Sequence, residues 1–255
     1  MNSGTDSFVG KAVLVTGAAS GIGAETARAF ADQGATVIAA DIAPIEATLA
    51  AHTNVRAERL DVTDEADWRN LMTRLRTSGQ GLDVLVNSAG VVTSGTIETV
   101  ELPELKQLFG VNTFGMFAGC RDAIALMKET GRDGAIVNVA SANAIKAQSW
   151  VSAYAASKAA VVSMTRTTAL HCAEAGYAIR VNAILPGIVR TAMVERLVDA
   201  APNPAEALAG LEKFHPNGRL LHPSEISSVV LFLASPAASG INGAAISVDN
   251  GMTAC

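Results

Sequence analysis

The chain has 255 residues, of which 49% are hydrophobic and 17% are charged, which suits one α/β domain that buries most of its apolar surface. Its net charge of −5, without any block of lysines or arginines, argues against binding to nucleic acid or to an acidic membrane surface. Three widely spaced cysteines, and no apolar segment before Lys11, argue against a secreted protein built on disulfides. We therefore expect a reduced, cytoplasmic setting.

Short apolar runs alternate with amphipathic stretches along the whole chain. The apolar runs predict seven strands, at 12–16, 36–40, 55–60, 82–87, 135–140, 178–184 and 244–248. The stretches between them predict helices, at 22–33, just after Pro44, and at 64–77, 102–129, 152–175 and 224–233. Such an alternation indicates an α/β fold, a doubly wound, Rossmann-type parallel sheet covered on both faces. We expect residues 1–255 to form a single NAD-binding catalytic domain, with a substrate lid at about 190–222.

A glycine-rich turn is predicted between the first strand and the first helix. Residues 16–23 read TGAASGIG, with a G-x-x-x-G-x-G spacing. Glycine lets the turn be tight and lets the backbone approach a pyrophosphate, whose charge is stabilised at a helix N-terminus. The turn alone is weak support for a nucleotide site, but its place at the first strand–helix junction strengthens it. The residues expected to bind the cofactor here are Gly17, Ser20, Gly21, Ile22 and Gly23.

Asp41 ends the second predicted strand, where the dinucleotide-binding fingerprint expects an acid about 20 residues downstream. Its carboxylate can accept hydrogen bonds from the ribose hydroxyls, and it repels the 2′-phosphate of NADP. Ala40 and Ile42 flank it, and Ser20 rather than a basic residue precedes Gly21. We therefore expect NAD as the cofactor; the alternative is that Asp41 only caps the following turn.

Small and polar residues also follow the third and fourth predicted strands. Open α/β sheets bind their ligands at the carboxyl ends of the strands, so these residues are expected to meet the cofactor, the first two at its adenine ring. For the acid at position 61, capping the next helix is an equally good interpretation. The residues concerned are Asp61, Val62, Asn87, Ala89 and Gly90.

Tyr154 and Lys158 stand four residues apart in the segment YAASK, which puts a phenol and an ammonium group on one face of the predicted helix. A free tyrosine has a pKa of about 10 and is a poor base at neutral pH. A nearby lysine cation, together with the positive nicotinamide ring, would lower that pKa toward working pH. Tyr154 is thus predicted to take the proton of an alcohol while hydride leaves its carbon, and to return it to a ketone in the reverse direction.

Two further residues complete the expected catalytic site. Ser141, at the end of the fifth strand, can hydrogen-bond the same substrate oxygen. Asn112, inside the predicted helix at 102–129, is expected to interrupt that helix and to position a water toward Lys158. Tyr-x-x-x-Lys by itself is common on solvated helix surfaces. Its combination with the glycine turn, Asp41 and Ser141 favours catalysis.

These motifs occur in a fixed order from about Lys11 to Met252. The further pieces are NSAG at 87–90, VNTFG at 111–115, RVNAILPGIVRT at 180–191 and ISVDNG at 246–251. Together with TGAASGIG, YAASK and a serine 13 residues before the tyrosine, they make the chain resemble a classical short-chain dehydrogenase/reductase. The departures from the family pattern are mild and remove no catalytic group: Ser88, Ala140 and Asn250.

The resemblance implies both a catalytic set and a nicotinamide-binding loop. The implied catalytic tetrad is Asn112, Ser141, Tyr154 and Lys158, of which the last two also contact the cofactor. In the implied loop, backbone groups of Ile188 and the hydroxyl of Thr191 would fix the carboxamide. The residues of this loop are Pro186, Gly187, Ile188 and Thr191.

The resemblance also implies assembly, because similar members pair two long helices and form tetramers. The predicted helices at 102–129 and 152–175 carry apolar residues on several faces, more than one sheet face needs. We therefore expect a homotetramer. The apolar residues of the first of these helices include Leu105, Leu108, Phe109, Met116 and Phe117.

The substrate pocket is expected to be lined by residues 90–93 and 193–214 and by Ala142, Asn143, Gln148 and Trp150, a mostly apolar set without an arginine to clamp a carboxylate or phosphate. The alternative for the apolar residues of 193–214 is that they pack a lid onto the domain. The segments at 119–131 and 171–184 resemble bacterial hydroxysteroid dehydrogenases. We therefore expect an NAD-dependent oxidoreductase for a bulky, apolar secondary alcohol or ketone, hydroxysteroid-like or cyclic.

Two other functions compete with this one. A 3-oxoacyl-type ketoreductase would usually take NADPH, which Asp41 disfavours. A non-catalytic NAD-binding relative would have no use for Tyr154 and Lys158 as a pair. The four histidines are not spaced as a ligand set, so no metal site is expected.

Overall fold

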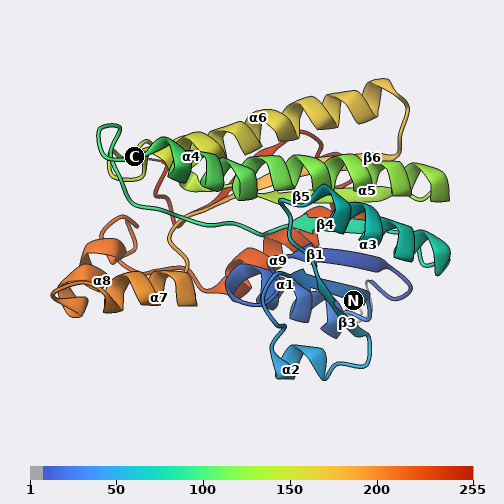
Figure 1. The fold of residues 1–255 in the computed structure, drawn as a ribbon, viewed down its shortest axis with the longest axis horizontal. Coiled ribbons are helices and arrows are strands. Elements are labelled where there is room, and N and C mark those ends of the chain that lie inside the picture. The colour runs from blue at the N-terminus through green and yellow to red at the C-terminus, as the bar shows by residue number, and fades with distance from the viewer. Residues whose placement is uncertain (1–7, 255) are drawn as a thin grey trace.

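The computed structural model describes residues 8–254. The first seven residues, on which part of the expectation about a signal segment rests, and Cys255 lie outside the described residues. Seven strands form one parallel sheet in the order β3-β2-β1-β4-β5-β6-β7, which confirms the predicted fold class (Figure 1). The strands are β1 (Ala12–Thr16), β2 (Thr36–Asp41), β3 (Val55–Arg59), β4 (Val84–Asn87), β5 (Gly134–Val139), β6 (Ile179–Pro186) and β7 (Ala245–Val248).

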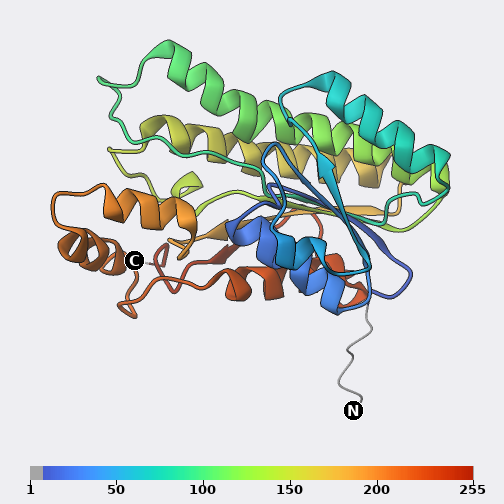
Figure 2. The same cartoon turned by 60° about the horizontal axis from the view of Figure 1, so that its bottom comes forward.

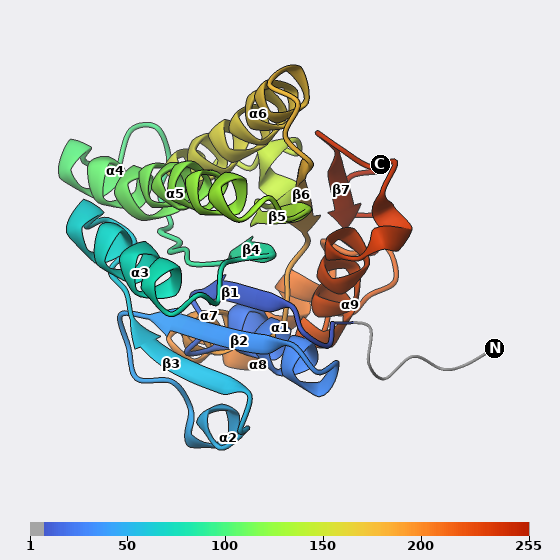
Figure 3. The ribbon, with the colours of Figure 1, turned by 90° about the vertical axis from the view of Figure 1, so that its right-hand side faces the viewer.

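Helices cover both faces of this sheet (Figure 3). On one face, α1 (Gly21–Asp32) and α9 (Pro223–Ala234) share a buried apolar cluster with the strands. On the other, α3 (Glu65–Thr77), α5 (Met116–Thr130) and α6 (Ser152–Glu174) enclose a second cluster with Trp68 fully buried in it. The smaller elements are α2 (Ala47–Ala50), α4 (Leu102–Phe109), η1 (Gly110–Gly115), η2 (Ala142–Ala144), α7 (Ala192–Asp199), α8 (Pro204–Glu212) and η3 (Pro236–Ala238).

The order of the strands reverses at β1, which has β2 and β3 on one side and β4 to β7 on the other. Open α/β sheets bind ligands at such a switch point, beyond the carboxyl ends of the strands. The glycine turn, Asp41, Ser141 and Pro186 all lie at these carboxyl ends. The sheet therefore brings residues that are far apart in the sequence to one edge.

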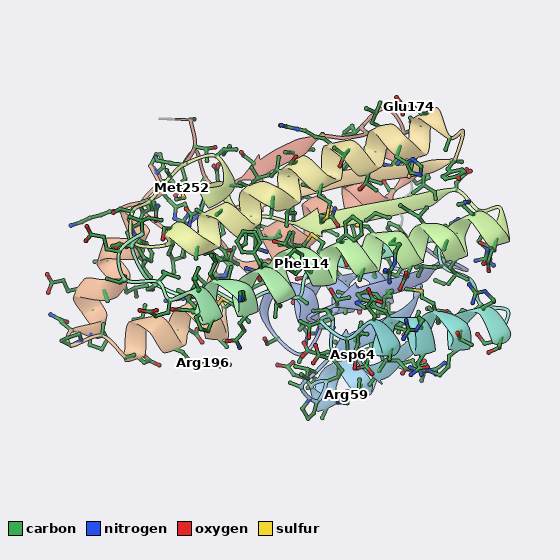
Figure 4. All side chains as sticks on the ribbon, turned by 45° about the horizontal axis from the view of Figure 1, so that its top comes forward. Arg59, Asp64, Phe114, Glu174, Arg196 and Met252 are labelled. Atoms are coloured by element: carbon green, nitrogen blue, oxygen red, sulfur yellow. The ribbon has the colours of Figure 1, made fainter. Side chains whose placement is uncertain are left out.

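The segment predicted as a lid, 190–222, forms α7 and α8. Figures 1 and 2 place both helices at one end of the molecule, beside the carboxyl ends of the strands. Arg196 of α7 and Met252 lie at this end, and Glu174, the last residue of α6, lies at the opposite end (Figure 4). In the part of the chain from Phe8 to Ala254, no helix combines the length and apolar character needed to cross a bilayer.

The helix predicted at 102–129 is divided in the structure. Between α4 and α5 lies η1, a π-helix of six residues that contains Asn112. A π-helix replaces the normal i→i−4 hydrogen bonds with longer ones and occurs often at functional sites. The expectation that regular helical bonding is interrupted around Asn112 is thus confirmed.

Candidate active site

The turn between β1 and α1 has a shape that only glycine permits. A Cβ added at Gly23 would lie 2.1 Å from the carbonyl oxygen of Gly17, so this part of the turn is closed on itself. Gly17 and Gly21 both have positive φ, +69° and +57°. Ser20 caps α1 without a side-chain hydrogen bond to the helix, and the first turn of α1 holds no acidic residue. The open N–H groups at this positive helix end fit the pyrophosphate of a dinucleotide.

Asp41 is fixed beside this turn. Its Oδ2 accepts the N–H of Ala19 at 3.0 Å and its Oδ1 accepts that of Ala43 at 2.9 Å. Asp41 therefore does cap the following turn, and this leaves its role toward the cofactor open. Each carboxylate oxygen has a second lone pair, so the same group can still accept ribose hydroxyls. Asp41 thus fits the ribose of the dinucleotide whose pyrophosphate fits the turn.

Arg59 is a basic residue near Asp41 that the sequence analysis missed. The two residues are register partners on β2 and β3. The guanidinium of Arg59 binds Asp67 at 3.2 Å and is largely exposed. Because Arg59 stands on another strand, only the strand pairing reveals that a cation adjoins Asp41.

Residues that follow β3 and β4 line one hollow together, but their polar groups point in different directions. Asp61 accepts both the hydroxyl and the N–H of Thr63, at 2.7 and 2.9 Å, and these bonds lower its pKa. These bonds lie in the turn before α3, and the helix itself is capped by Asp64, which accepts the N–H of Ala66, so the helix-cap interpretation of Asp61 is wrong. The amide of Asn87 is buried and donates to Asn138 Oδ1 at 2.9 Å. The sequence predicts that Asn87 contacts the cofactor, but its amide nitrogen points into the protein interior. One narrow hollow is lined by Thr16, Val62, Asn87, Ala89, Val111, Gly115 and Met116.

Thr16 fastens the end of β4 to the glycine turn. Its hydroxyl accepts the N–H groups of Ser88 and Ala89 at 3.1 and 3.2 Å. A Cβ on Gly17 would come within 2.7 Å of the Ala89 backbone, so the two segments are in contact. The sequence analysis gave Thr16 no role, although it immediately precedes the first glycine of the turn.

Tyr154 and Lys158 lie together at the ends of β4 and β5. Lys158 is 4% exposed, and its ammonium donates to the carbonyl of Val139 at 2.9 Å and lies 5.8 Å from the centre of the Tyr154 ring. Ser141 hydrogen-bonds the phenol of Tyr154. A Cβ on Gly90 would lie 3.4 Å from the Lys158 nitrogen, so this pair adjoins the loop that Thr16 holds.

Burial works against ionisation of both groups. It raises the pKa of Tyr154, and the hydrogen bond from Ser141 offsets this only in part. It lowers the pKa of Lys158 to about 8. A low dielectric disfavours any charged form, so without a nicotinamide ring the pKa of Tyr154 lies above its ordinary value despite the nearby lysine. The lower pKa expected of Tyr154 with both Lys158 and a positive nicotinamide ring stays a prediction.

Asn112 holds the site together through its side chain. Its amide group exchanges two hydrogen bonds with the backbone of Val91, at 2.8 and 2.9 Å, and donates to the hydroxyl of Ser157 at 3.1 Å. The side chain is fully buried. These bonds engage the side-chain amide, which ties the loop after β4 to α6. The water-positioning role expected of Asn112 stays a prediction.

The predicted nicotinamide-binding loop follows β6, and one of its groups is engaged. Thr191 caps α7 without a side-chain bond to the helix, and its methyl group would lie 3.1 Å from a Cβ on Gly21, so the loop adjoins the glycine turn. The N–H of Ile188, expected to bind the carboxamide, donates to Nε2 of His215 at 3.0 Å. Among the histidines, which were named only to exclude a metal site, no signal in the sequence pointed to this contact of His215.

The expected substrate wall is more polar than the composition indicated. Thr93 Oγ1, Asn143 Oδ1 and Gln148 Nε2 are buried and have no hydrogen-bond partner among the described residues. The rings of Trp150 and Phe214 lie with their centres 6.4 Å apart, so the segment after Ser141 meets the chain that follows α8.

Comparison with known proteins finds similar dehydrogenases and reductases. A family model described as Enoyl-(Acyl carrier protein) reductase matches residues 17–253. The chain is 39% identical to 3-beta-hydroxysteroid dehydrogenase of Comamonas testosteroni over 249 residues, and this match covers 96% of this chain and 97% of that protein. It is 37% identical over 255 residues to cis-4-hydroxycyclohexanecarboxylate dehydrogenase of Sinomonas cyclohexanicum, covering 98% and 99%.

Solved protein structures share the fold of this chain over nearly its whole length. The ligand-free aldohexose dehydrogenase of Thermoplasma acidophilum superposes with a TM-score of 0.89 at 31% identity, covering 98% of this chain and 96% of that one. The structure of ElxO with NADP bound gives a TM-score of 0.87 at 26% identity, covering 96% and 99%. The chain belongs to the short-chain dehydrogenase/reductase family of oxidoreductases, which use a nicotinamide cofactor.

Proposed function

We propose that this oxidoreductase transfers a hydride between NAD and a cyclic or steroid-like secondary alcohol, with Asn112, Ser141, Tyr154 and Lys158 as its tetrad. The observation that carries the proposal is the contact chain from the glycine turn to the phenol. Gly17 adjoins Ala89, the next residue Gly90 adjoins Lys158, and Lys158 lies beside Tyr154. A dinucleotide held by the turn would bring its reactive end to that phenol.

In this mechanism Tyr154 is the acid/base. When bound, an oxidised nicotinamide would supply the hydride acceptor and a positive charge. Ser141 donates a hydrogen bond to the substrate oxygen, and Tyr154, as phenolate, takes the hydroxyl proton. In the reverse direction the neutral phenol gives its proton to the ketone oxygen. Lys158, as a cation, stabilises the phenolate, while Asn112 keeps the loop after β4 against α6.

The preference for NAD rests on Asp41. Its carboxylate lies beside the glycine turn and would repel a 2′-phosphate. Arg59 is nearby on β3, but its charge is engaged by Asp67. This also weighs against a 3-oxoacyl-type ketoreductase that uses NADPH.

The relatives support a cyclic substrate, since two of them are named for a steroid and for a hydroxycyclohexane. The buried, unpaired atoms of Asn143 and Gln148 add a polar requirement, because such groups are costly to leave without a partner. We expect the substrate to carry a second polar group beyond its alcohol. The chain at 190–222, with α7 and α8, would close over it as a lid.

The expected homotetramer and the cytoplasmic location stay predictions. Leu108 and Met116 are buried in the subunit, which removes them from the proposed interface. Phe114 and Phe117 are 64% and 55% exposed on the neighbouring turns of η1 and α5, and they support assembly through this helix. The buried, free thiols of Cys120 and Cys172 are compatible with a reducing compartment.

The proposed reaction is tested with Tyr154→Phe, assayed on cyclic secondary alcohols and steroids with NAD by nicotinamide absorbance. The variant removes the acid/base and should lower kcat by about 10²–10⁴-fold, while NAD affinity stays near that of the unmodified enzyme. Tyr177→Phe is the matched control, because the chain has two tyrosines and this one packs against His171. Full activity in Tyr154→Phe would eliminate the mechanism.

Cofactor choice is tested with Asp41→Ala and Asp41→Asn. Loss of charge-assisted bonds to the ribose should weaken NAD binding in Asp41→Ala by roughly tenfold, and removing the repulsion should strengthen NADP binding in both variants. Dissociation constants for both cofactors give the answer directly. An unchanged ratio of NAD to NADP affinity in Asp41→Ala would contradict the assignment.

Assembly is tested with Phe117→Glu by analytical ultracentrifugation. The unmodified chain should sediment as a tetramer, and burying a carboxylate in the helix interface should produce smaller species. Glu98→Gln, a change at an exposed site outside these helices, serves as the control. A monomeric unmodified chain would refute the expected assembly.

A further inference from the structure

His215 is buried against the loop that follows β6. It stands just after α8, is 1% exposed, and its Nε2 accepts the N–H of Ile188 at 3.0 Å. A Cβ on Gly187 would lie 2.5 Å from this nitrogen, so any larger residue there would collide with the imidazole. The histidine and the glycine therefore fit each other.

The remaining contacts of this loop come from the backbone. Gly187 donates to the carbonyl of Val248 at 3.1 Å, Leu221 donates to that of Ile188 at 3.0 Å, and Arg190 donates to that of Leu221 at 2.8 Å. These bonds persist when side chains change. The bond from the Ile188 amide to His215 is the one that a side-chain substitution removes.

We propose that His215 is a positioning residue that holds the nicotinamide-binding loop in place through the amide of Ile188. This role rests on the proposed function, since it assigns the loop to the nicotinamide end of the cofactor. It also implies that the Ile188 N–H is committed to the imidazole. The Ile188 carbonyl, which accepts the Leu221 N–H, keeps a second lone pair, and it and the Thr191 hydroxyl are then left for the carboxamide.

The bond requires one protonation state of His215. A neutral imidazole carries a single proton, so a ring whose Nε2 accepts must be protonated at Nδ1. That Nδ1 has no hydrogen-bond partner among the described residues. Burial lowers the pKa of His215, the nearby Asp249 carboxylate raises it and Arg219 lowers it, with burial the largest effect. His215 thus stays neutral, and an acceptor, at neutral pH.

If His215 positions this loop, its loss should weaken binding of the nicotinamide half of the cofactor and leave binding of the adenosine half unchanged. In the proposed function the glycine turn and Asp41 bind the adenosine half, whereas His215 hydrogen-bonds the loop after β6. Losing the imidazole should loosen only the part of the site that receives the nicotinamide. ADP-ribose, which lacks the nicotinamide, separates the two halves experimentally.

The test compares His215→Met and His215→Gln by calorimetric titration with NAD and with ADP-ribose. Glutamine and methionine are similar in length, but only the glutamine amide oxygen can accept the Ile188 N–H. We expect His215→Met to bind NAD roughly tenfold more weakly, with ADP-ribose affinity unchanged, and His215→Gln to recover most of the loss. His52→Met, the same substitution in the turn after α2, should change neither affinity.

Other outcomes would overturn the proposal. Equal loss of NAD and ADP-ribose in His215→Met indicates a general structural defect, and tighter NAD binding indicates that the imidazole competes with the carboxamide. Failure of the unmodified chain to bind NAD removes the proposed function itself and this role with it. Should His215→Met not fold, nitrogen NMR of the unmodified protein decides: a proton on Nδ1 supports the role, and one on Nε2 refutes it.

Discussion

The desolvation of one phenol and one ammonium group is the constraint on which the rest of the site depends. Burial raises the pKa of Tyr154 and lowers that of Lys158 to about 8, so the protein by itself disfavours the charge that catalysis requires. In our account the missing positive charge arrives with the oxidised cofactor. The base then becomes strong only when a hydride acceptor is present, which couples proton removal to cofactor binding.

Buried hydrogen bonds keep this constrained pair in register with the sheet. Asn112 links the loop after β4 to α6. The carbonyl of Val139, at the end of β5, accepts a hydrogen bond from the Lys158 ammonium. Beneath them, Asn138 accepts from Asn87 and donates to Thr165 at 2.9 Å, which joins β4, β5 and α6. Each of these polar groups is paired in the interior, where an unpaired one would be costly. The network therefore stiffens the two strands and the helix that position Tyr154.

Local patterns were enough to predict the strands, the glycine turn and the Tyr154–Lys158 spacing, because periodicity and turn chemistry act over a few residues. Three features depended on tertiary contacts and were missed or misjudged. Arg59 adjoins Asp41 only through strand pairing, and His215 reaches Ile188 only because α8 returns the chain to β6. The raised pKa of Tyr154 follows from burial, which spacing along a helix does not measure.

The most direct test is an absorbance titration of the Tyr154 phenol with and without NAD. In a Tyr177→Phe background Tyr154 is the only remaining tyrosine, so the tyrosinate signal belongs to it alone. Our account predicts a pKa above the ordinary value of about 10 in the free protein, falling well below 10 when NAD is saturating. The same pKa in both states would contradict the central claim, since the cofactor would then not control the charge of the base.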